Sequence, residues 1–458
     1  MSLSLLLAEG APVMELALRF ADAGHELYLV GGPVRDALLS RPASMDVDLA
    51  TDATPEQVQA LLKDSASKLW LQGARFGTVG AMVSNTMLEI TTFRTERYQP
   101  ASRHPEVTFA PDIRTDLMRR DFTVNAMAIK LPDKTSVDPF GGVEDLKRKI
   151  LRTPQDPLDS FSDDPLRMLR AFRFMSQLEF EIEETTFNAI IELRDQIQHI
   201  SAERIRDELS KLLVGAAPAR SLSRADESGL LDLVLPEMTA LKLEQDPQHR
   251  HKDVFKHTLV VLERTPPVLV LRLAALLHDI GKPSTRRIEA DKGVTFHHHE
   301  ARGARMTGKR LKELRFSNEV VDEVTHLVAM HGRANEVQLW GDSAVRRYVR
   351  EAGKYLDDLI TLVRADCTTR NKTKAAELAA RMDDLEHRIA VLREKEELDR
   401  IRPELNGNEI MEHLGIPPGP EVGRAWEYLL EIRLEEGEIG REEALSRLES
   451  WAEDNGLR

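Results

Sequence analysis

Residues 27–51 read LYLVGGPVRDALLSRPASMDVDLAT, and the fold of the first part of the chain can be predicted from them. A short apolar strand over 27–30 ends in Gly31-Gly32, and a helix is expected from Val34 to Leu39. The run Asp46-Val47-Asp48-Leu49 alternates acidic and apolar residues, which predicts a half-buried strand. Strand, glycine turn, helix and strand in this order predict an α+β unit: a small mixed sheet with flanking helices.

The segments on either side extend this pattern. A helix is expected over 11–24, another opens at Thr54-Pro55-Glu56, and paired strands are expected at 78–83 and 87–93. From Pro165 onward almost every segment has the residue spacing of an amphipathic helix. Composition shifts and polar junctions divide the chain into an α+β head, a helical neck, a helical body and a helical tail, over residues 1–150, 151–218, 219–370 and 371–458.

Composition bounds the class of protein. The 458 residues carry 63 basic and 77 acidic side chains, a net charge of −14, and one cysteine. A single cysteine excludes a disulfide framework and a cysteine zinc cluster, and it fits a reducing compartment. The most apolar run, 268–277, is too short to cross a bilayer, and the first residues lack the basic start of a signal peptide. We therefore expect a cytoplasmic protein without a membrane partner.

Asp46 and Asp48 are candidates for metal binding. At positions i and i+2 of a strand both carboxylates point to one face, and two such charges need a cation between them or must share a proton. Hard oxygen ligands suit Mg²⁺. Glu89, on a later strand, is a candidate third carboxylate. The alternative is an exposed strand end with two solvated acids.

Basic residues near these acids suit phosphate. Gly31-Gly32 allows close approach to a phosphate ahead of a helix start, and Arg35 lies one turn into that helix; a plain turn is the alternative. Arg119-Arg120 precedes an apolar segment and would neutralise phosphates, or else forms a surface dibasic site. Asp164 is a natural cap before Pro165.

Three arginines follow Asp164 at a spacing of three residues, Arg167, Arg170 and Arg173. They share a broad helical face, opposite an apolar stripe of leucines and Phe172. A carboxylate and an arginine one turn apart can present an acceptor and donors to the edge of a base. The alternative is a capping acid followed by solvated arginines.

The order of these motifs resembles one family. Four motifs follow one another in the order that is typical of class II tRNA nucleotidyltransferases, the CCA-adding enzymes. They are Gly-Gly-x-Val-Arg-Asp, Asp-x-Asp, Arg-Arg-Asp-Phe-Thr-x-Asn-Ala and Asp-Pro-x-Arg-x-Leu-Arg-Ala-x-Arg-Phe. The bacterial poly(A) polymerases share this architecture. Residues 138–146, 203–208 and 407–423 resemble the family's head-closing turn, neck motif and carboxyl-terminal segment. Asp163 stands where the family usually has Glu.

The resemblance implies a nucleotidyltransferase head and a set of roles. Asp46 and Asp48 would hold the catalytic Mg²⁺, and the 3′-hydroxyl of tRNA would attack the α-phosphorus of CTP or ATP. Residues implied to bind the nucleotide are Gly32, Arg35 and Arg120 at the triphosphate, Asp164 and Arg167 at the base edge, and Arg170 and Arg173 in support. The implied function is template-independent addition of C, C and A to the tRNA 3′ end.

Within the family, residues 72–79 favour the CCA branch. They read Gln-Gly-Ala-Arg-Phe-Gly-Thr-Val, where the poly(A) branch usually carries paired basic residues and a later His-Val. Residues 94–112 match the flexible loop that helps the switch from CTP to ATP. Poly(A) addition, CC-only addition and A-only addition remain alternatives. Two more distant hypotheses are a metal phosphohydrolase with an RNA-binding head and a non-catalytic RNA-binding protein.

A second constellation resembles an HD-type phosphohydrolase domain. Adjacent His278-Asp279, with a histidine before and an aspartate well after, suits a divalent transition metal such as Mn, Ni or Fe. The resemblance implies His257, His278, Asp279 and Asp366 as core ligands, with His299 and His331 at a second metal or at the phosphate. The alternative is a helical scaffold that keeps these residues without activity.

An acidic protein that binds tRNA needs local basic surface. Candidates are Arg204, Arg206 and Lys211 in the neck, with Arg346, Arg347, Arg350, Arg364, Arg370, Lys372 and Lys374 further along. Recognition would then depend on helix shape and phosphates. Solvated faces are the alternative for these residues. For the alternating charges over 375–400, a solvated helix face is the expectation. The partners expected are tRNA, CTP and ATP, and the oligomeric state is left open.

Overall fold

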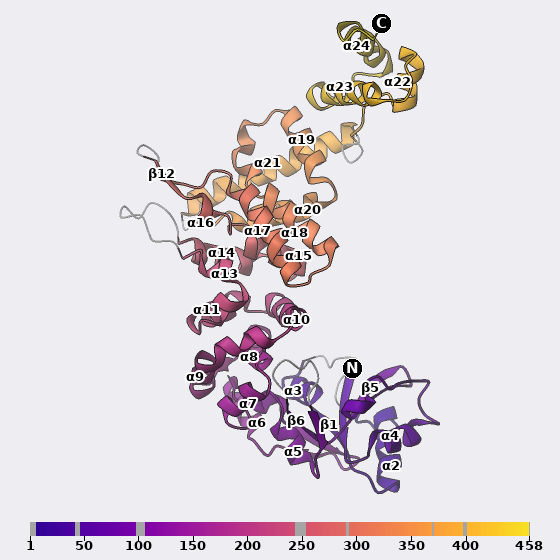
Figure 1. Cartoon of the computed structure of the whole chain (residues 1–458), viewed down its shortest axis with the longest axis vertical. Coiled ribbons are helices and arrows are strands. Elements are labelled where there is room, and N and C mark those ends of the chain that lie inside the picture. Colours follow the sequence, from indigo (N-terminus) through magenta and orange to yellow (C-terminus); the bar gives the residue numbers. More distant parts are fainter. Residues whose placement is uncertain are drawn as a thin grey trace. The chain divides into compact units, whose positions relative to one another are not determined.

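The computed structural model describes residues 6–41, 46–97, 106–242, 253–289, 293–368, 371–396 and 401–457. They form two compact units, Met1–Thr239 and Ala240–Arg458, each considered by itself below (Figure 1). The finer division into head, neck, body and tail stays a prediction. None of the described helices is long and apolar enough to span a bilayer.

One seven-stranded sheet organises the start of the first unit, in the order β3-β4-β5-β2-β1-β8-β9. The strands are β1 (Leu27–Val30), β2 (Asp46–Thr51), β3 (Lys68–Trp70), β4 (Thr78–Val83), β5 (Thr86–Thr92), β8 (Ala128–Leu131) and β9 (Thr135–Val137). The central pair β2 and β5 runs parallel, and the other neighbours run antiparallel. The predicted small mixed sheet is confirmed.

Short helices flank this sheet, and a separate ribbon projects from it. The helices are α2 (Pro12–Asp22), α3 (Gly32–Leu38), α4 (Pro55–Leu62), α5 (Ile113–Met118) and α6 (Gly142–Arg148), with 3₁₀ turns η1 (Ala74–Phe76) and η2 (Thr123–Asn125). The ribbon pairs β6 (Arg94–Arg97) with β7 (Glu106–Phe109). Helix α4 begins with the predicted Thr cap, completed by a reciprocal bond to Gln57.

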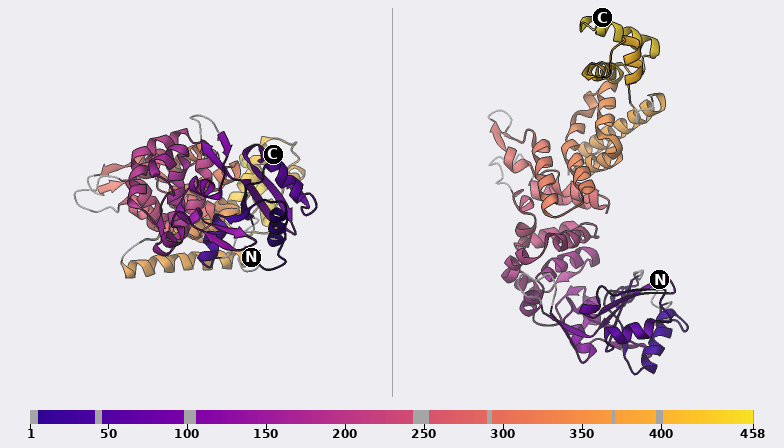
Figure 2. Two further views of the ribbon diagram at one scale, coloured as in Figure 1. Left: turned by 90° about the horizontal axis from the view of Figure 1, so that it is seen from below. Right: turned by 45° about the vertical axis from the view of Figure 1, so that its right-hand side comes forward.

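Helices complete the first unit. They are α7 (Pro157–Asp163), α8 (Leu166–Leu178), α9 (Glu184–Leu193), η3 (Arg194–His199), α10 (Ala202–Leu213), α11 (Pro218–Glu227), α12 (Leu230–Val234) and α13 (Pro236–Thr239); β10 (Ile150–Leu151) pairs with β11 (Glu181–Ile182). Figure 2 shows them in magenta after the indigo strands. Helix α8 lies against α10, where Ser176 Oγ donates to the Leu212 carbonyl at 2.7 Å. It is therefore buried on most of its circumference.

The described part of the second unit is almost entirely helical. Its helices are α14 (Val254–Arg264), α15 (Leu269–Leu277), α16 (Lys282–Thr285), α17 (His299–Glu313), α18 (Asn318–Met330), η4 (Arg333–Leu339), α19 (Asp342–Ala352), η5 (Gly353–Tyr355), α20 (Leu356–Asp366), α21 (Lys372–Glu396), α22 (Gly407–Leu414), α23 (Pro420–Glu436) and α24 (Arg441–Asp454). Strands β12 (Arg287–Glu289) and β13 (Gly293–Thr295) pair in an antiparallel manner. The last three helices share their own apolar core.

Several basic residues predicted to face RNA are used inside the second unit instead. The Arg346 side chain is buried and donates to the carbonyls of Leu434 and Glu435 at 3.2 Å. Arg347 pairs with two glutamates of α23. Arg364 pairs with Asp383 and Glu386 of α21. Arg346 is therefore withdrawn from any RNA surface, whereas Arg347 and Arg364 keep 35% of their side chains exposed and stay candidates. Sequence spacing does not reveal which acids pack against such residues. Arg370 and the Lys372 side chain lie outside the described residues.

Helix α21 has the expected solvated face and a buried face opposite it. Its charges alternate, but Met382, Leu385, Ile389 and Leu392 recur at helical spacing and are buried. One side of the helix therefore packs against the unit, while charged residues such as Asp383, Asp384 and Glu394 lie on the exposed face that the sequence predicted.

Candidate functional site

A cavity of about 510 Å³ opens in the first unit between the sheet and helices α8 and α10. Eight arginines and three aspartates line it, an excess of positive charge that suits a polyanion such as a nucleoside triphosphate. The described lining residues are Gly31, Gly32, Arg35, Asp48, Arg94, Arg119, Arg120, Asp121, Asn125, Asp164, Arg167, Arg170, Arg173, Phe174, Gln177 and Arg204. Every nucleotide-binding residue predicted from the sequence lies in this wall.

The glycine turn forms one edge of the cavity. Gly31 has φ of +72°, and a Cβ added to it would lie 2.9 Å from Nη1 of Arg120 and 3.8 Å from Oδ2 of Asp48. Only glycine allows this backbone conformation together with this close approach. The turn therefore brings backbone, guanidinium and carboxylate to one place, which is the arrangement that a metal-bound phosphate requires.

Strand β2 carries the aspartate pair. Asp46 and Asp48 are paired in register with Met87 and Glu89 of β5, and residues in register on neighbouring strands share a face of the sheet. The Asp48 side chain is half-buried and lines the cavity, whereas Glu89 is exposed beside it. The side chain of Asp46 lies outside what the structure describes. Oxygen donors at this spacing fit the hard-ligand preference of Mg²⁺.

A buried polar network connects the sheet side of the cavity with helix α8. Asp121 accepts from Arg170 Nε at 2.8 Å and from Asn125 Nδ2 at 2.9 Å. Asn125 in turn accepts from Arg35 Nη1 at 2.7 Å. Burial raises the pKa of the Asp121 carboxyl, but Arg170 and the Asn125 hydrogen bond overcome this and hold it well below its usual value. The carboxylate is therefore charged and fixes Arg170 and Asn125 in place.

Glu208 of α10 holds the other side of the same arginines. Its carboxylate lies 2.9 Å from Arg173 Nε and 3.9 Å from Arg170 Nη1. Burial, followed by the neighbouring Arg170, lowers the pKa of Arg173 to about 10. The Arg173 guanidinium also lies over the Phe174 ring, 4.0 Å from its centroid. Arg170 and Arg173 are thus held by acids, and Arg173 also by an aromatic ring.

The predicted base-edge pair lies at the start of α8. Asp164 Oδ1 accepts the Leu166 N–H at 3.2 Å, so this acid caps the helix as predicted, and its Oδ2 accepts from Arg204 Nη2 at 2.9 Å. Arg167 donates to Ser160 Oγ at 2.9 Å and to the Arg119 carbonyl. Both side chains are buried and fixed. The alternative of solvated arginines is wrong for Arg167 and Arg173, which are 7% and 8% exposed.

Sequence reasoning missed part of this wall. Asp121 and Asn125 lie inside a motif that was recognised, yet only Arg120 of that motif was assigned to the nucleotide. Polar residues placed within an apolar segment are the signal that could have identified them, since buried polar groups need partners. Arg94 and Phe174 carried no such signal. Arg204 was assigned to the RNA surface but lines the cavity.

An Asp121→Asn variant is expected to lose about 3 kcal/mol of unfolding free energy, because it leaves Arg170 without its buried counter-charge. This is the lower end of the range, since the Arg170 side chain is one-third exposed. The folded-state pKa of Asp121 is depressed, so its contribution is present above the unfolded value of about 4 and is lost as pH falls below it. Urea unfolding at pH 7 and pH 3 measures both. An unchanged pH dependence in the variant would contradict the assignment.

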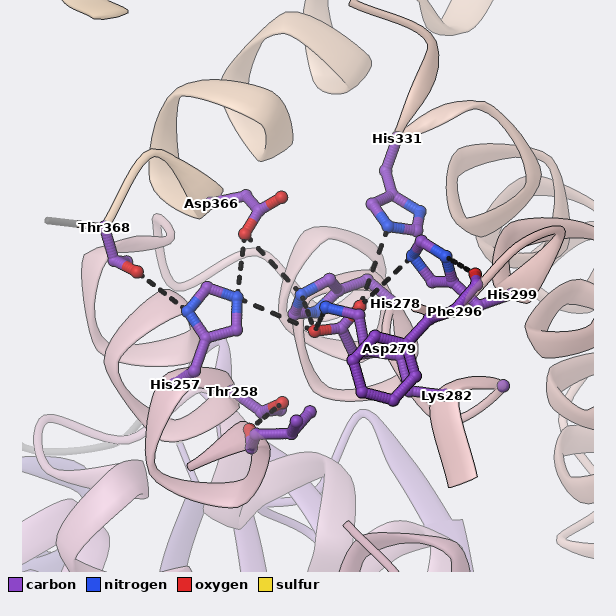
Figure 3. A network of polar contacts seen from close by, with 12 residues as sticks. His257, Thr258, His278, Asp279, Lys282, Phe296, His299, His331, Asp366 and Thr368 are labelled. Atoms are coloured by element: carbon purple, nitrogen blue, oxygen red, sulfur yellow. Dashed lines mark hydrogen bonds and ion pairs between the residues drawn. The ribbon is translucent and has the colours of Figure 1, made fainter. Parts of the chain in front are cut away.

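The second unit holds a cluster of histidines and aspartates, drawn in Figure 3. His257 comes from α14, His278 and Asp279 follow α15, His299 begins α17, His331 follows α18, and Asp366 ends α20. In each histidine Nδ1 lies 2.7–2.9 Å from a carbonyl or hydroxyl oxygen outside the cluster: Thr368, Ala275, Phe296 and Val328, respectively. In His278, His299 and His331 the partner is a carbonyl, which can only accept, so the proton lies on Nδ1 and Nε2 is left as an acceptor. All four Nε2 atoms face the two carboxylates.

Asp279 lies between two groups of potential ligands. Its Oδ2 is 3.2 Å from His278 Nε2 and 3.7 Å from His257 Nε2, on the side of Asp366. Its Oδ1 is 3.5 Å from His299 Nε2 and 3.9 Å from His331 Nε2. His257, His278 and Asp366 form one set with metal-ligand spacing, and Asp279, His299 and His331 form another. The carboxylate of Asp279 can therefore contribute one oxygen to each of two sites.

The charges of this cluster favour a cation. Burial lowers the pKa of His278, but Asp279 and Asp366 overcome this and raise it. Burial raises the pKa of Asp279, and the charge of the neighbouring His278 brings it well below normal. His278 Nε2 and Asp279 Oδ1 are buried without a hydrogen-bond partner among the described residues. Donors of this kind, aimed inward and left unpaired, fit a divalent transition metal.

The sequence matches three protein families in succession. Residues 27–152 match the Poly A polymerase head domain, residues 179–242 the probable RNA and SrmB-binding site of polymerase A, and residues 253–392 the HD domain. The first match contains the glycine turn and the aspartate pair, and the third contains the histidine cluster. These two matches imply dependence on divalent metal ions.

Whole-chain relatives agree with these matches. The A-adding tRNA nucleotidyltransferase of Deinococcus radiodurans is 37% identical over 77% of this chain and 82% of its own length. The CCA-adding enzyme of Bacillus licheniformis is 35% identical over 70% of this chain and 75% of its own. The crystal structure of the Bacillus stearothermophilus CCA-adding enzyme with CTP has a TM-score of 0.70 and 26% identity, covering 97% of this chain and 98% of that one.

Proposed function

The chain belongs to the family of tRNA nucleotidyltransferases that contains the CCA-adding and A-adding enzymes, and we propose that it completes the tRNA 3′ end by adding C, C and A from CTP and ATP. The observation that carries the proposal is the arginine-lined cavity beside the Asp46/Asp48 strand. CTP in the Bacillus stearothermophilus structure supports the choice of nucleotide. The expected place of action is the cytoplasm, where tRNA, CTP and ATP are available.

Each wall of the cavity has a proposed role. Asp46 and Asp48 would hold Mg²⁺, which supplies Lewis-acid stabilisation of charge on the phosphate oxygens. Gly32, with Arg35 and Arg120, would bind the triphosphate through backbone N–H groups and guanidinium donors. These residues orient the nucleotide so that the attacking 3′-hydroxyl and the leaving pyrophosphate stand in line with the α-phosphorus.

Base selection is proposed for the start of α8. The carboxylate of Asp164 accepts hydrogen bonds, and the guanidinium of Arg167 donates them, so together they can pair with the edge of C or A. Both are already held by neighbours, which keeps the pair in place before the nucleotide arrives. Arg170 and Arg173 support the nucleotide from the same helix.

Nucleotide addition tests the proposal directly. Transcripts of tRNA ending before CCA, at C and at CC are incubated with Mg²⁺ and labelled CTP, ATP or both, and resolved at single-nucleotide resolution. We expect three additions in the order C, C, A, followed by a stop. A long A ladder on any RNA would move the protein to the poly(A) branch, and no extension would overturn the proposal.

A-only addition is the second candidate within the family. The relative from Deinococcus radiodurans, which aligns over most of both chains, is named as an A-adding enzyme. The same transcripts distinguish the two activities: an A-adding enzyme extends only the transcript that ends in CC, and a CC-adding enzyme stops before the terminal A. Complete CCA addition remains the first choice because residues 72–79 have the CCA-branch pattern and the other relatives cited are CCA-adding enzymes.

The histidine cluster supports a second activity, hydrolysis of phosphate esters such as 2′,3′-cyclic phosphates. His257, His278, Asp279 and Asp366 would hold a first Mn, Ni or Fe ion, with His299 and His331 at a second. The inward-facing Nε2 atoms of the cluster favour a hydrolytic site over a helical scaffold without activity. Release of phosphate monoester from a 2′,3′-cyclic nucleotide, tested with Mn²⁺, Ni²⁺ and Fe²⁺, measures it. No release with any of the three would leave the cluster as scaffold.

A Gly281→Ala variant is expected to disrupt the second metal group selectively. A Cβ at Gly281 would lie 2.1 Å from the His299 carbonyl oxygen, so α17 must move and carry His299 away from Asp279. Bound metal, measured by elemental analysis after Mn²⁺ loading, should fall from two ions towards one. In the control Gly308→Ala, also in α17, the added Cβ lies 3.4 Å from Thr325 Oγ1, and metal content should be retained.

A further inference from the structure

We propose that Asp116 is a positioning residue for the incoming triphosphate: it holds the guanidinium groups of Arg119 and Arg120 together and ties them to the base of the β6–β7 ribbon. The inference rests on the proposed nucleotidyl transfer and deepens it. Asp116 does not line the cavity, so its effect on the nucleotide passes through these arginines. Nothing in the roles assigned above uses this acid.

Asp116 is a buried charge shared between two arginines. It lies on α5 and is 0% exposed. Oδ1 is 2.7 Å from Arg119 Nη2, and Oδ2 is 3.2 Å from Arg120 Nη2. Burial raises the pKa of this carboxyl, but the two arginines overcome that effect and lower it. A buried carboxylate that divides its oxygens in this way restricts both guanidinium groups at once.

The two arginines reach different parts of the cavity. Arg120 Nη1 approaches the Gly31 turn beside Asp48, and Arg120 Nε is buried without a hydrogen-bond partner in the described part of the chain. Nη1 of Arg120 is therefore placed to donate to a phosphate oxygen at the glycine turn. The carbonyl of Arg119 accepts from Arg167, the proposed base-edge residue. Asp116 thus holds Arg120, at the proposed triphosphate site, by direct contact. It acts on Arg167, at the proposed base site, indirectly through Arg119.

A third contact links Asp116 to the ribbon. Its Oδ1 accepts the backbone N–H of Arg94, the first residue of β6, at 3.4 Å. Arg94 lines the cavity, and its Nη1 donates to Thr78 Oγ1 at 3.1 Å and to the Phe76 carbonyl. The same carboxylate therefore joins the phosphate wall to the ribbon base and to the η1 turn. Because CTP and ATP share a triphosphate, the loss of Asp116 should affect both nucleotides alike.

An Asp116→Asn variant tests the inference, since it keeps the shape of the side chain and removes its charge. We expect KM for CTP and for ATP to rise about tenfold, with kcat within about threefold of wild type, because an interaction used for binding is weakened. Pyrophosphate, tested as a competitive inhibitor, should weaken by a similar factor. Fixed-substrate kinetics and titration calorimetry of the Mg²⁺ nucleotide complexes give these values.

Asp112→Ala is the matched control on the same helix. Asp112 caps α5 by accepting the Thr115 N–H at 2.9 Å, and its carboxylate bonds to Thr115 rather than to either arginine. Its loss should lower the thermal unfolding midpoint and leave KM unchanged. An equal rise in KM in this control would show that a loosened α5 is sufficient, and would overturn the inference. An unchanged or lower KM in Asp116→Asn would also overturn it.

A second variant, Asp116→Glu, tests the inference if Asp116→Asn does not fold. Asp116→Glu keeps the charge that the buried arginines require and moves its oxygens by one methylene, so KM should rise while kcat is retained. An unchanged KM in this variant overturns the inference. Wild-type protein that binds neither CTP nor ATP would instead overturn the proposed function, so the two failures are distinguishable.

Discussion

An Asp48→Asn variant is expected to lose nucleotide addition by ~10³-fold or more while binding tRNA as tightly as wild type. The variant removes one of the two carboxylates proposed to hold Mg²⁺ beside the glycine turn. Lewis-acid stabilisation of a phosphoryl transition state is worth several kcal/mol, and each 1.36 kcal/mol is a tenfold change in rate. Extension of a tRNA ending before CCA measures the rate, and a gel-shift titration measures the binding.

Asp52→Asn provides the control for that experiment. Asp52 lies just after β2, where its carboxylate accepts the Glu26 N–H at 2.8 Å, and it is not part of the cavity wall. The control should extend tRNA at a rate close to wild type. Extension by Asp48→Asn within tenfold of wild type would contradict the metal role assigned to the aspartate pair.

An Asp279→Asn variant is expected to abolish hydrolysis of 2′,3′-cyclic nucleotides in the presence of added Mn²⁺ or Ni²⁺. Asp279 is the residue whose two oxygens face the two halves of the histidine cluster, so its loss weakens both proposed metal positions. Bound metal should fall to one ion or fewer. Addition of C, C and A should continue, because the cavity that carries it lies in the other unit.

Asp253→Asn is the matched control for the histidine cluster. Asp253 caps helix α14, which carries His257, and asparagine caps a helix equally well. Metal content and hydrolysis should therefore be retained. Persistent hydrolysis in Asp279→Asn would exclude the cluster as the hydrolytic site, and a parallel loss of tRNA extension would show that the two activities are not separable.

Local sequence was sufficient for the elements that frame the cavity. The glycine pair after an apolar strand, the Thr cap of α4 and the alternation of acids along β2 each act over a few residues. Such signals are written into backbone conformation and side-chain direction, so they can be recognised without knowing the partners. The His278-Asp279 pair was recognised differently, by its resemblance to an HD-type domain.

Partnerships between distant segments required the tertiary structure. Asp121 and Arg170 are 49 residues apart, and Asp164 and Arg204 are 40 apart, yet each pair is in hydrogen-bond contact. Periodicity assigned the arginines of α8 to one face but left open whether water or protein covers it. Arg346 was expected to face RNA and is buried.

Sequence alone therefore identified the residues that are proposed to carry the chemistry: the aspartate pair, the glycine turn, the arginines of α8 and the histidine cluster. Which of these residues are fixed in place by buried partners became visible only in the tertiary structure. Asp116 illustrates the difference, because nothing in its local sequence distinguishes it from a surface acid of a short helix. Its burial against two arginines and the ribbon gives it a role, since a charge removed from water must be paired by whatever the fold brings within reach.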